Sequence, residues 1–265
     1  GYNSLKSNTG SCNTGIGEQA LTSNTTGANN TGIGRGVLAA NTEGDNNVAV
    51  GDGALDANTT GCCNVAVGNN ALDASTTASY NTALGFKSLT TNTSGNVNTA
   101  VGHASAQQNT TGTNLVALGA RALEQNTTGS YNTALGKNSL ICNTTADTNT
   151  AVGYQSLCSN TTGSSLTALG ACSLDSNTTG NENTGLGFRS LCSNTTGFQN
   201  TAVGSPVMRD NTTGCCNVAI GYRALDNNTT ANNNTAVGTD SLCANTTGAN
   251  NTAVGKIALC ANTTG

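Results

Sequence analysis

The chain has 265 residues, of which 8% are charged and 3% are aromatic, with no Trp, one His and a formal net charge of −4. This composition lacks the basic surface of a nucleic-acid-binding protein, and no run of about 20 apolar residues predicts insertion into a membrane. It also lacks the large apolar side chains that would fill the core of a globular enzyme of this length.

A glycine recurs every seventeen residues from Gly17 to Gly255. We number the positions of each repeat from 0, at this glycine, to 16, at the aliphatic residue before the next glycine. Position 4 is nearly always Leu, position 7 Asn and position 8 Thr. Residues 1–265 therefore form a single uninterrupted repeat array, with unit 1–16 one residue short and unit 255–265 incomplete. We expect the array to be a segment of a longer fibre.

The repeat predicts an all-β fold. Each unit ends in an alternating segment such as V-A-V at 48–50, 65–67 or V-A-I at 218–220, which favours a short strand, and the glycines and the Asn-Thr-Thr segment favour turns. We predict a parallel β-solenoid with one 17-residue coil per turn and about 15 coils, stacked about 4.8 Å apart. The repeat length is constant because one extra residue would turn every inward side chain outward.

Alternation places positions 14 and 16 on one face of each strand, and we expect that face to point inward together with Leu at position 4. Thr at position 8 is expected to join this interior and to bond to a neighbouring coil through its hydroxyl. The predicted core stack is Leu21, Ile33, Val50, Leu55, Val67, Leu72, Val101, Leu123, Val152, Leu157, Leu191, Val203, Ile220 and Val254.

Position 15 lies between two expected inward positions, so we expect it to point outward. In every complete repeat it is Ala or Gly, which would allow the backbone of another solenoid to approach closely, or would fit a tight corner of the same chain. Because a thin rod buries few large apolar side chains, lateral association is the expected remedy. The predicted lateral interface is Ala49, Ala66, Ala83, Ala100, Ala151, Ala168, Ala202 and Ala253.

The segments 46–51, 64–68 and 217–221 resemble the N-x-V-A-I-G repeat of the YadA-like heads of trimeric autotransporter adhesins. The longer string N-T-A-V-G-x-x-A-L-x-x-N-T-T-G is similar to arrays in surface and tail-fibre proteins that end in an endosialidase-type chaperone domain. The resemblance implies a left-handed β-roll, a side-by-side homotrimer, an extracellular place on a cell or virion surface, and a surface carbohydrate or protein as receptor. This coil is longer than the adhesin coil, and position 14 is mostly Thr.

Most repeats carry an N-x-[ST] acceptor at position 7, which would be accessible to a glycosyltransferase if Thr at position 8 points inward. The alternative is a ladder of stacked Asn amides at a turn. The candidate glycosylation sites are Asn24, Asn58, Asn92, Asn109, Asn126, Asn143, Asn160, Asn177, Asn194, Asn211, Asn228, Asn245 and Asn262.

No arrangement of residues predicts catalysis, a cofactor or a metal site. His103 is the sole histidine and occupies a variable, exposed position, and the thirteen acidic residues form no pair at a fixed position. The eleven cysteines lack C-x-x-C spacing. Cys243 and Cys260 lie one coil apart, which is within reach of a strained disulfide, but the pairing of the cysteines is not determined by the sequence.

The sequence therefore predicts a non-enzymatic, structural or adhesive extracellular fibre that associates with itself. Two alternatives remain open at this point. One is a filament coated with glycans on its Asn and Thr rows. The other is a solenoid that binds ice or a crystal surface, although that activity requires two outward Thr separated by one inward residue, whereas Thr-Thr at positions 8 and 9 gives one of each.

Overall fold

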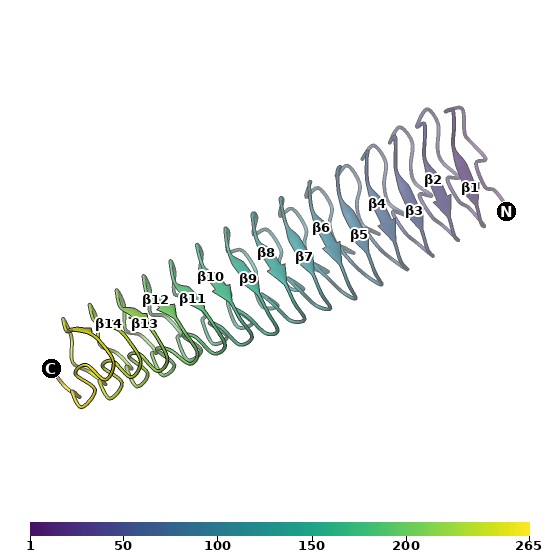
Figure 1. The fold of residues 1–265 in the computed structure, drawn as a ribbon. Coiled ribbons are helices and arrows are strands. Elements are labelled where there is room, and N and C mark those ends of the chain that lie inside the picture. The colour runs from purple at the N-terminus through teal and green to yellow at the C-terminus, as the bar shows by residue number, and fades with distance from the viewer. The chain divides into compact units, whose positions relative to one another are not determined.

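The computed structural model describes all residues 1–265 and contains only β-strands, turns and bends, with no helix. The chain divides into two compact units, Gly1–Asn132 and Thr133–Gly265, which are described separately (Figure 1). The strands of the first unit are β1 (Thr14–Ile16), β2 (Thr31–Ile33), β3 (Val48–Val50), β4 (Val65–Val67), β5 (Thr82–Leu84), β6 (Thr99–Val101) and β7 (Val116–Leu118). Those of the second are β8 (Thr133–Leu135), β9 (Thr150–Val152), β10 (Thr167–Leu169), β11 (Thr184–Leu186), β12 (Thr201–Val203), β13 (Val218–Ile220), β14 (Thr235–Val237) and β15 (Thr252–Val254).

Successive strands within each unit pair in parallel with a constant shift of one repeat. Val48 faces Val65 across β3 and β4, and Thr150 faces Thr167 across β9 and β10. Equivalent positions of neighbouring coils therefore lie directly above one another, and we call such a set of residues a row. The predicted 17-residue parallel β-solenoid is confirmed within each unit.

Hydrogen bonds join the coils outside the strands as well. The amide of Leu55 donates to the carbonyl of Ala71 at 3.0 Å in the following coil, whereas the amide of Asn70 donates to Asp52 at 3.0 Å in the preceding one. Since the bonds run in both directions, the turn segments pair with both neighbouring coils although they are not strands. Each coil consequently depends on two neighbours to satisfy its backbone.

These contacts hold the backbone in conformations that an isolated chain would avoid. Leu55 has a φ of 52°, in the left-handed region, and the equivalent Leu of other coils does the same. The repeat glycine Gly102 has a φ of 133°, and a Cβ on it would lie 2.6 Å from the carbonyl oxygen of Gly119 in the next coil. Glycine at position 0 is thus required both by conformation and by close stacking.

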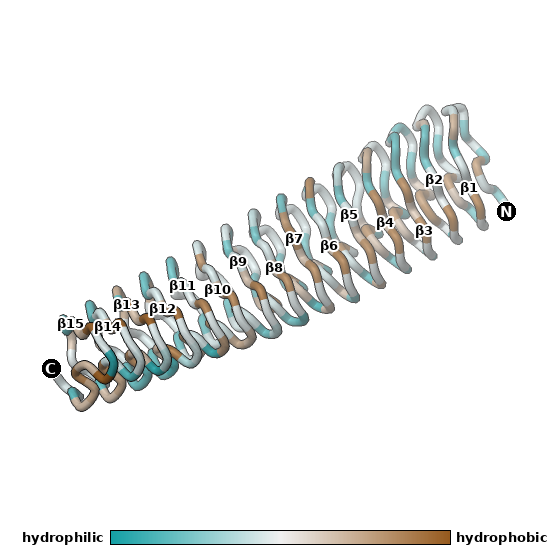
Figure 2. The backbone as a smooth tube through the Cα atoms, viewed as in Figure 1, coloured by the Kyte–Doolittle hydropathy of each residue, from teal (hydrophilic) through white to brown (hydrophobic).

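The interior is lined by smaller side chains than the sequence predicts. Leu at position 4 is fully buried, which confirms Leu21, Leu55, Leu72, Leu123, Leu157 and Leu191 of the predicted core. Position 15 is also inside: the alanines of β3 to β14 are 0% exposed. Hydrophobic and hydrophilic segments recur at the same place in successive coils of each unit (Figure 2).

The other half of the predicted core was placed on the wrong face. Position 16 points outward and is partly or fully exposed at Ile33, Val50, Val67, Val101, Val152, Val203, Ile220 and Val254. The reason is the space opposite the strand, which the position-4 leucine already fills. A Cβ on Gly32 would lie 3.0 Å from Val37 Cγ1 and 3.5 Å from Leu21 Cδ1, so only a methyl group or a hydrogen fits there.

Two rows of buried asparagines line the rest of the interior. In the position-7 row, Asn41 Nδ2 donates to Asn24 Oδ1 at 2.6 Å and to the Gly44 carbonyl at 3.0 Å. In the position-13 row, Asn47 Nδ2 donates to the Gly61 carbonyl at 2.9 Å and Asn47 Oδ1 accepts from the Asn64 amide at 3.0 Å. The amide ladder is confirmed, and it supplies the hydrogen bonds that buried amides require.

The position-7 ladder is interrupted at one coil. Ser75 replaces Asn, and its hydroxyl has no hydrogen-bond partner. Asn58 Oδ1, which would accept from the next amide, is buried and also unpaired. Asn92 Nδ2 keeps only its bond to the Gly95 carbonyl. A buried polar atom left without a partner costs about 1–3 kcal/mol.

Substituting Ser75→Asn should therefore stabilise the protein, because the new amide donates to Asn58 and accepts from Asn92. We expect the free energy of unfolding to rise by about 1–2 kcal/mol, measured by urea denaturation. The matched reverse change, Asn109→Ser, breaks an intact part of the ladder and should lower stability by a similar amount. A loss of stability with Ser75→Asn would contradict the assigned ladder.

The inward and outward positions of a strand can be distinguished by adjacent substitutions in β9. Ala151 is fully buried whereas Val152 is partly exposed. Ala151→Val should overpack the interior and lower the free energy of unfolding by about 1–3 kcal/mol. Val152→Ala should change it by no more than about 0.5 kcal/mol. Thermal unfolding followed by circular dichroism measures both, and the reverse order of effects would restore the orientation that the sequence predicted.

Candidate functional site

The most regular exposed surface of each unit is the outer side of its strands. We define the strand face as the outward side chains at positions 14 and 16 of each strand, which are Thr or Val and Val, Ile or Leu. Leu84 is 45% exposed, Leu169 50% and Ile220 41%. No charged side chain occurs on this face in any strand, and the parallel register spaces successive side chains of a row by one coil. It is a flat, mostly apolar surface without a partner.

The predicted lateral interface is wrong. Ala49, Ala66, Ala83, Ala100, Ala151, Ala168 and Ala202 are 0% exposed and Ala253 is 3% exposed. These side chains pack inside their own coil and cannot contact another molecule. The alternative considered from the sequence was a tight corner of the same chain; the alanines are indeed confined within their own chain, but at the centre of each strand and not at a corner.

The candidate glycosylation sites are likewise inside. Asn24, Asn58, Asn92, Asn109, Asn126, Asn143, Asn160, Asn177, Asn194, Asn211, Asn228 and Asn245 are 0% exposed, and Asn262 is partly buried in the final coil. Their Nδ2 atoms donate within the ladder, as Asn109 Nδ2 does to Asn92 Oδ1 at 2.7 Å. An asparagine acceptor has to be exposed and free, so the Asn row does not carry sugar in the folded protein.

Thr at position 8 points outward where the sequence predicts an inward side chain. The expected inter-coil bond is nevertheless present, since the Thr25 hydroxyl donates to the Thr42 carbonyl at 2.9 Å in the next coil. Asn at position 7 and Thr at position 8 have therefore exchanged their expected faces. The reason is that the amide makes more hydrogen bonds than a hydroxyl in the closed interior.

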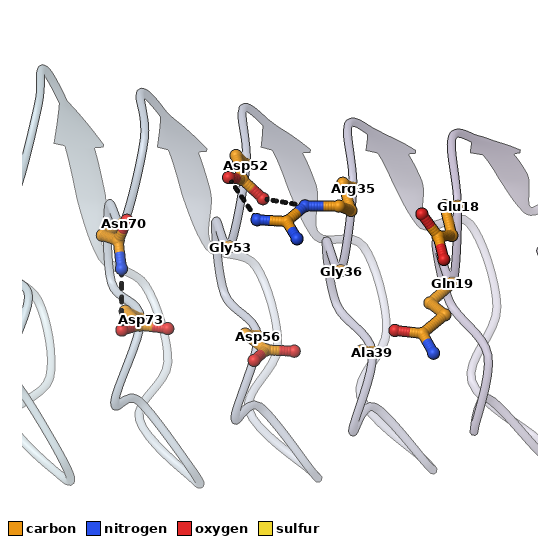
Figure 3. A pocket seen from close by; sticks show the side chains of 10 residues that line it. All are labelled: Glu18, Gln19, Arg35, Gly36, Ala39, Asp52, Gly53, Asp56, Asn70 and Asp73. Atoms are coloured by element: carbon orange, nitrogen blue, oxygen red, sulfur yellow. Dashed lines mark hydrogen bonds and ion pairs between the residues drawn. The ribbon is translucent and has the colours of Figure 1, made fainter.

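A second surface feature lies in the first unit. Glu18, Gln19, Arg35, Gly36, Ala39, Asp52, Gly53, Asp56, Asn70 and Asp73 line a groove of about 400 Å³ (Figure 3). We call it the acidic groove. It opens because Gly36 and Gly53 occupy position 2 and have no side chains to cover the space between the rows at positions 1 and 5.

The carboxylates of the acidic groove have opposite environments. Arg35 donates to both carboxylate oxygens of Asp52, at 3.1 and 2.9 Å, and this bond holds the pKa of Asp52 below its usual value. Partial burial, reinforced by the negative charges of Asp73 and Asp52, raises the pKa of Asp56. Asp73 accepts a hydrogen bond from Asn70 Nδ2 at 3.2 Å.

The His, Cys, Asp and Glu side chains do not gather into a metal site. The structure contains no group of three or more His, Cys, Asp or Glu residues that could hold a metal ion. His103 stacks on Phe86 with ring centroids 5.6 Å apart, and all eleven cysteines are free thiols. Cys243 Sγ lies 3.6 Å from the Cys260 carbonyl oxygen instead of forming a disulfide.

Comparison of the chain with family models, with curated proteins and with solved structures finds no match. The structure also has no helix of the length and hydrophobicity needed to cross a membrane.

The sequence contained signals for both surfaces. Position 14 is mostly Thr and otherwise Val, as a half-exposed strand position is, whereas position 15 accepts only Ala and Gly in complete repeats, as a sterically confined position does. The groove is marked by charged side chains at positions 1 and 5 of neighbouring repeats next to Gly36 and Gly53. The restriction at position 15 is visible in the consensus, but the groove signal appears only when individual repeats are compared.

The pH dependence of stability should separate the two carboxylates. Since the pKa of Asp56 is raised on folding, the folded state binds its proton more tightly, so its ionisation lowers stability as pH rises. Asp56→Asn should therefore stabilise the protein at pH 7, and this gain should shrink as pH falls towards 3.8, the usual Asp value. Urea denaturation at several pH values measures the difference.

The matched control is Asp52→Asn, for which the expected change in the free energy of unfolding has the opposite sign. Its lowered pKa means that the charged form stabilises the fold above the unfolded pKa, and that this contribution is lost as pH falls through the folded pKa. The variant should be less stable than the parent at pH 7 and equal to it in strong acid. Parallel pH profiles for the two variants would show that the groove does not distinguish the carboxylates.

Proposed function

We propose that the chain is a non-catalytic structural segment of an extracellular fibre, in which the strand face is covered by other copies of the same chain. The supporting observation is that this face is flat, exposed, mostly apolar and uncharged along all strands of each unit. Exposed apolar surfaces of this extent mark sites of association. The expected arrangement of three chains, the adhesive role and the place on a cell or virion surface follow from the resemblance to YadA-like heads.

A second copy of the chain is the occupant that fits this face best. Its own strand face has the same coil spacing, so rows of Val, Ile or Leu on one copy can pack between rows on the other. The length of a three-residue strand multiplied by the distance between coils gives an area of about 50 Å² per strand. The seven strands of the first unit and the eight of the second would present about 350 and about 400 Å², and both units have to take part to approach the roughly 800 Å² per partner of a stable protein interface.

The experiment places charges on the strand face. Leu169→Glu combined with Val203→Glu should convert the oligomer to a monomer of 26.2 kDa, because a buried unpaired carboxylate opposes association strongly. Sedimentation equilibrium at micromolar concentrations measures the mass, and circular dichroism reports whether the solenoid remains folded. An oligomer that persists in this variant would place the interface elsewhere.

The control introduces the same charges into the same coils on another face. Thr162→Glu combined with Thr196→Glu changes the exposed position 9, which already carries Glu43 in another coil. This variant should retain the mass of the parent oligomer. A parent protein that is itself a monomer would refute self-association through the strand face.

One observation favours a second candidate function, the binding of ice or another crystal surface. The T-A-V triplet of strands such as β6 and β9 presents an outward Thr and an outward Val separated by one inward Ala, so it has the spacing of the ice-binding arrangement with Val in place of the second Thr. In this case the parent would remain a monomer and would lower the freezing point of a solution below its melting point, and the strand-face double Glu variant would lose this activity.

A further inference from the structure

The aromatic side chains of this protein all lie on its surface. The sequence has five Tyr and three Phe, and each of the eight is at least 45% exposed. Aromatic residues usually contribute to a core or an interface, because each buries a large apolar area. Here the interior is too narrow for an aromatic ring, so these side chains do not contribute to the core. Any large contact that they make is with another molecule.

Three of them form a regular row in the second unit. Tyr154, Phe188 and Tyr222 occupy position 1 of their repeats and are thirty-four residues apart, which corresponds to two coils or about 9.6 Å. Their exposures are 49%, 51% and 52%. The coils between them carry Ala171 and Ser205 at the same position. We define Tyr154, Phe188 and Tyr222 as the aromatic row.

The backbone beneath the aromatic row is fixed by the stacking of the coils. Strands β9 to β13 pair in register, and the Tyr154 and Tyr222 carbonyls accept bonds from the amides of Cys172 and Asp240, each at 2.9 Å. The small side chains of Ala171 and Ser205 leave space between successive rings. The stacking of the coils thus sets the spacing of the three backbone positions that carry the rings.

Charged side chains flank two of the three rings. The Arg189 guanidinium lies 5.3 Å from the centroid of the Phe188 ring. Next to Tyr222, Arg223 Nε lies 3.6 Å from Asp240 Oδ1 and 3.9 Å from Asp226 Oδ2. A sugar presents a C–H face and hydroxyl groups. An exposed ring can contact the C–H face, and the charged groups beside it can form hydrogen bonds with the hydroxyls.

We propose that the aromatic row binds an extended, β-1,4-linked polysaccharide of the cellulose or chitin type. In such a chain each sugar is turned over relative to the one before, so equivalent faces recur at every second sugar, a distance close to the two-coil spacing. Successive rings of the aromatic row would stack on every second sugar of the polymer. An α-1,4-linked chain coils and does not present sugars along a straight line at this interval.

This inference rests on the adhesive role in the proposed function, because it names the class of ligand that the displayed fibre would bind. It does not depend on self-association, since the aromatic row lies at position 1 and not on the strand face. The strand-face variants can therefore fail to dissociate while sugar binding succeeds, and the reverse result is equally observable.

The test is depletion of the 265-residue chain from solution by microcrystalline cellulose, by chitin and by insoluble starch. The parent should bind cellulose or chitin but not starch. Phe188→Ala removes the central ring and should weaken binding about tenfold, which corresponds to about 1.4 kcal/mol. The triple variant Tyr154→Ala, Phe188→Ala, Tyr222→Ala should abolish binding, and Phe188→Tyr should retain it.

Two further variants distinguish a spaced row from general adhesiveness. Phe198→Ala removes a ring of similar exposure at another repeat position and should leave binding unchanged. Phe188→Ala combined with Ala171→Phe keeps three rings but moves one by a coil, and it should not restore affinity. Absence of binding by the parent, equal binding to starch, or retention of binding by the triple variant with an unchanged circular dichroism spectrum would overturn the proposal.

Discussion

The structure depends on hydrogen bonding between coils that repeat with a constant length of seventeen residues. Buried amides such as Asn41 are tolerated only because the coils before and after place an amide at the same height, and a buried amide without such a partner is costly. The left-handed backbone at Leu55 is held by the same contacts. No coil can satisfy its own interior, so stability is a property of the stack.

The narrow cross-section explains why this protein has apolar surfaces. Across from each strand the interior is filled by a position-4 leucine, which leaves room for Ala49 but not for Val50. The larger aliphatic side chains are therefore displayed on the strand face, and the aromatic rings lie outside for the same reason. The surfaces that we propose for association and for sugar binding arise from side chains that the interior cannot accommodate.

Much of the fold is predictable from the sequence, because a constant period, a leucine row and alternating triplets permit few architectures. The orientation of the triplets is not. Alternation shows that Val48 and Val50 share a face and that Ala49 has the other, but not which face is inside. That depends on the volume opposite the strand. At Gly32 this volume is set by Leu21, eleven positions earlier, and by Val37, five positions later. Reasoning from side-chain size alone predicted that the wrong face of each strand points inward, and the predicted interface was therefore wrong as well.

The outer rows vary independently of the interior, so one scaffold carries different surfaces. Position 1 bears Glu18, Arg35 and Asp52 beside the acidic groove of the first unit, whereas in the second unit it bears the aromatic row. Neither set belongs to the amide ladders, which join the side chains of positions 7 and 13. A ligand therefore encounters groups at multiples of one coil spacing on a backbone that is already ordered. Recognition by such a surface is decided by which coils carry a given side chain, and changing it requires substitutions in a single row with no change in the fold.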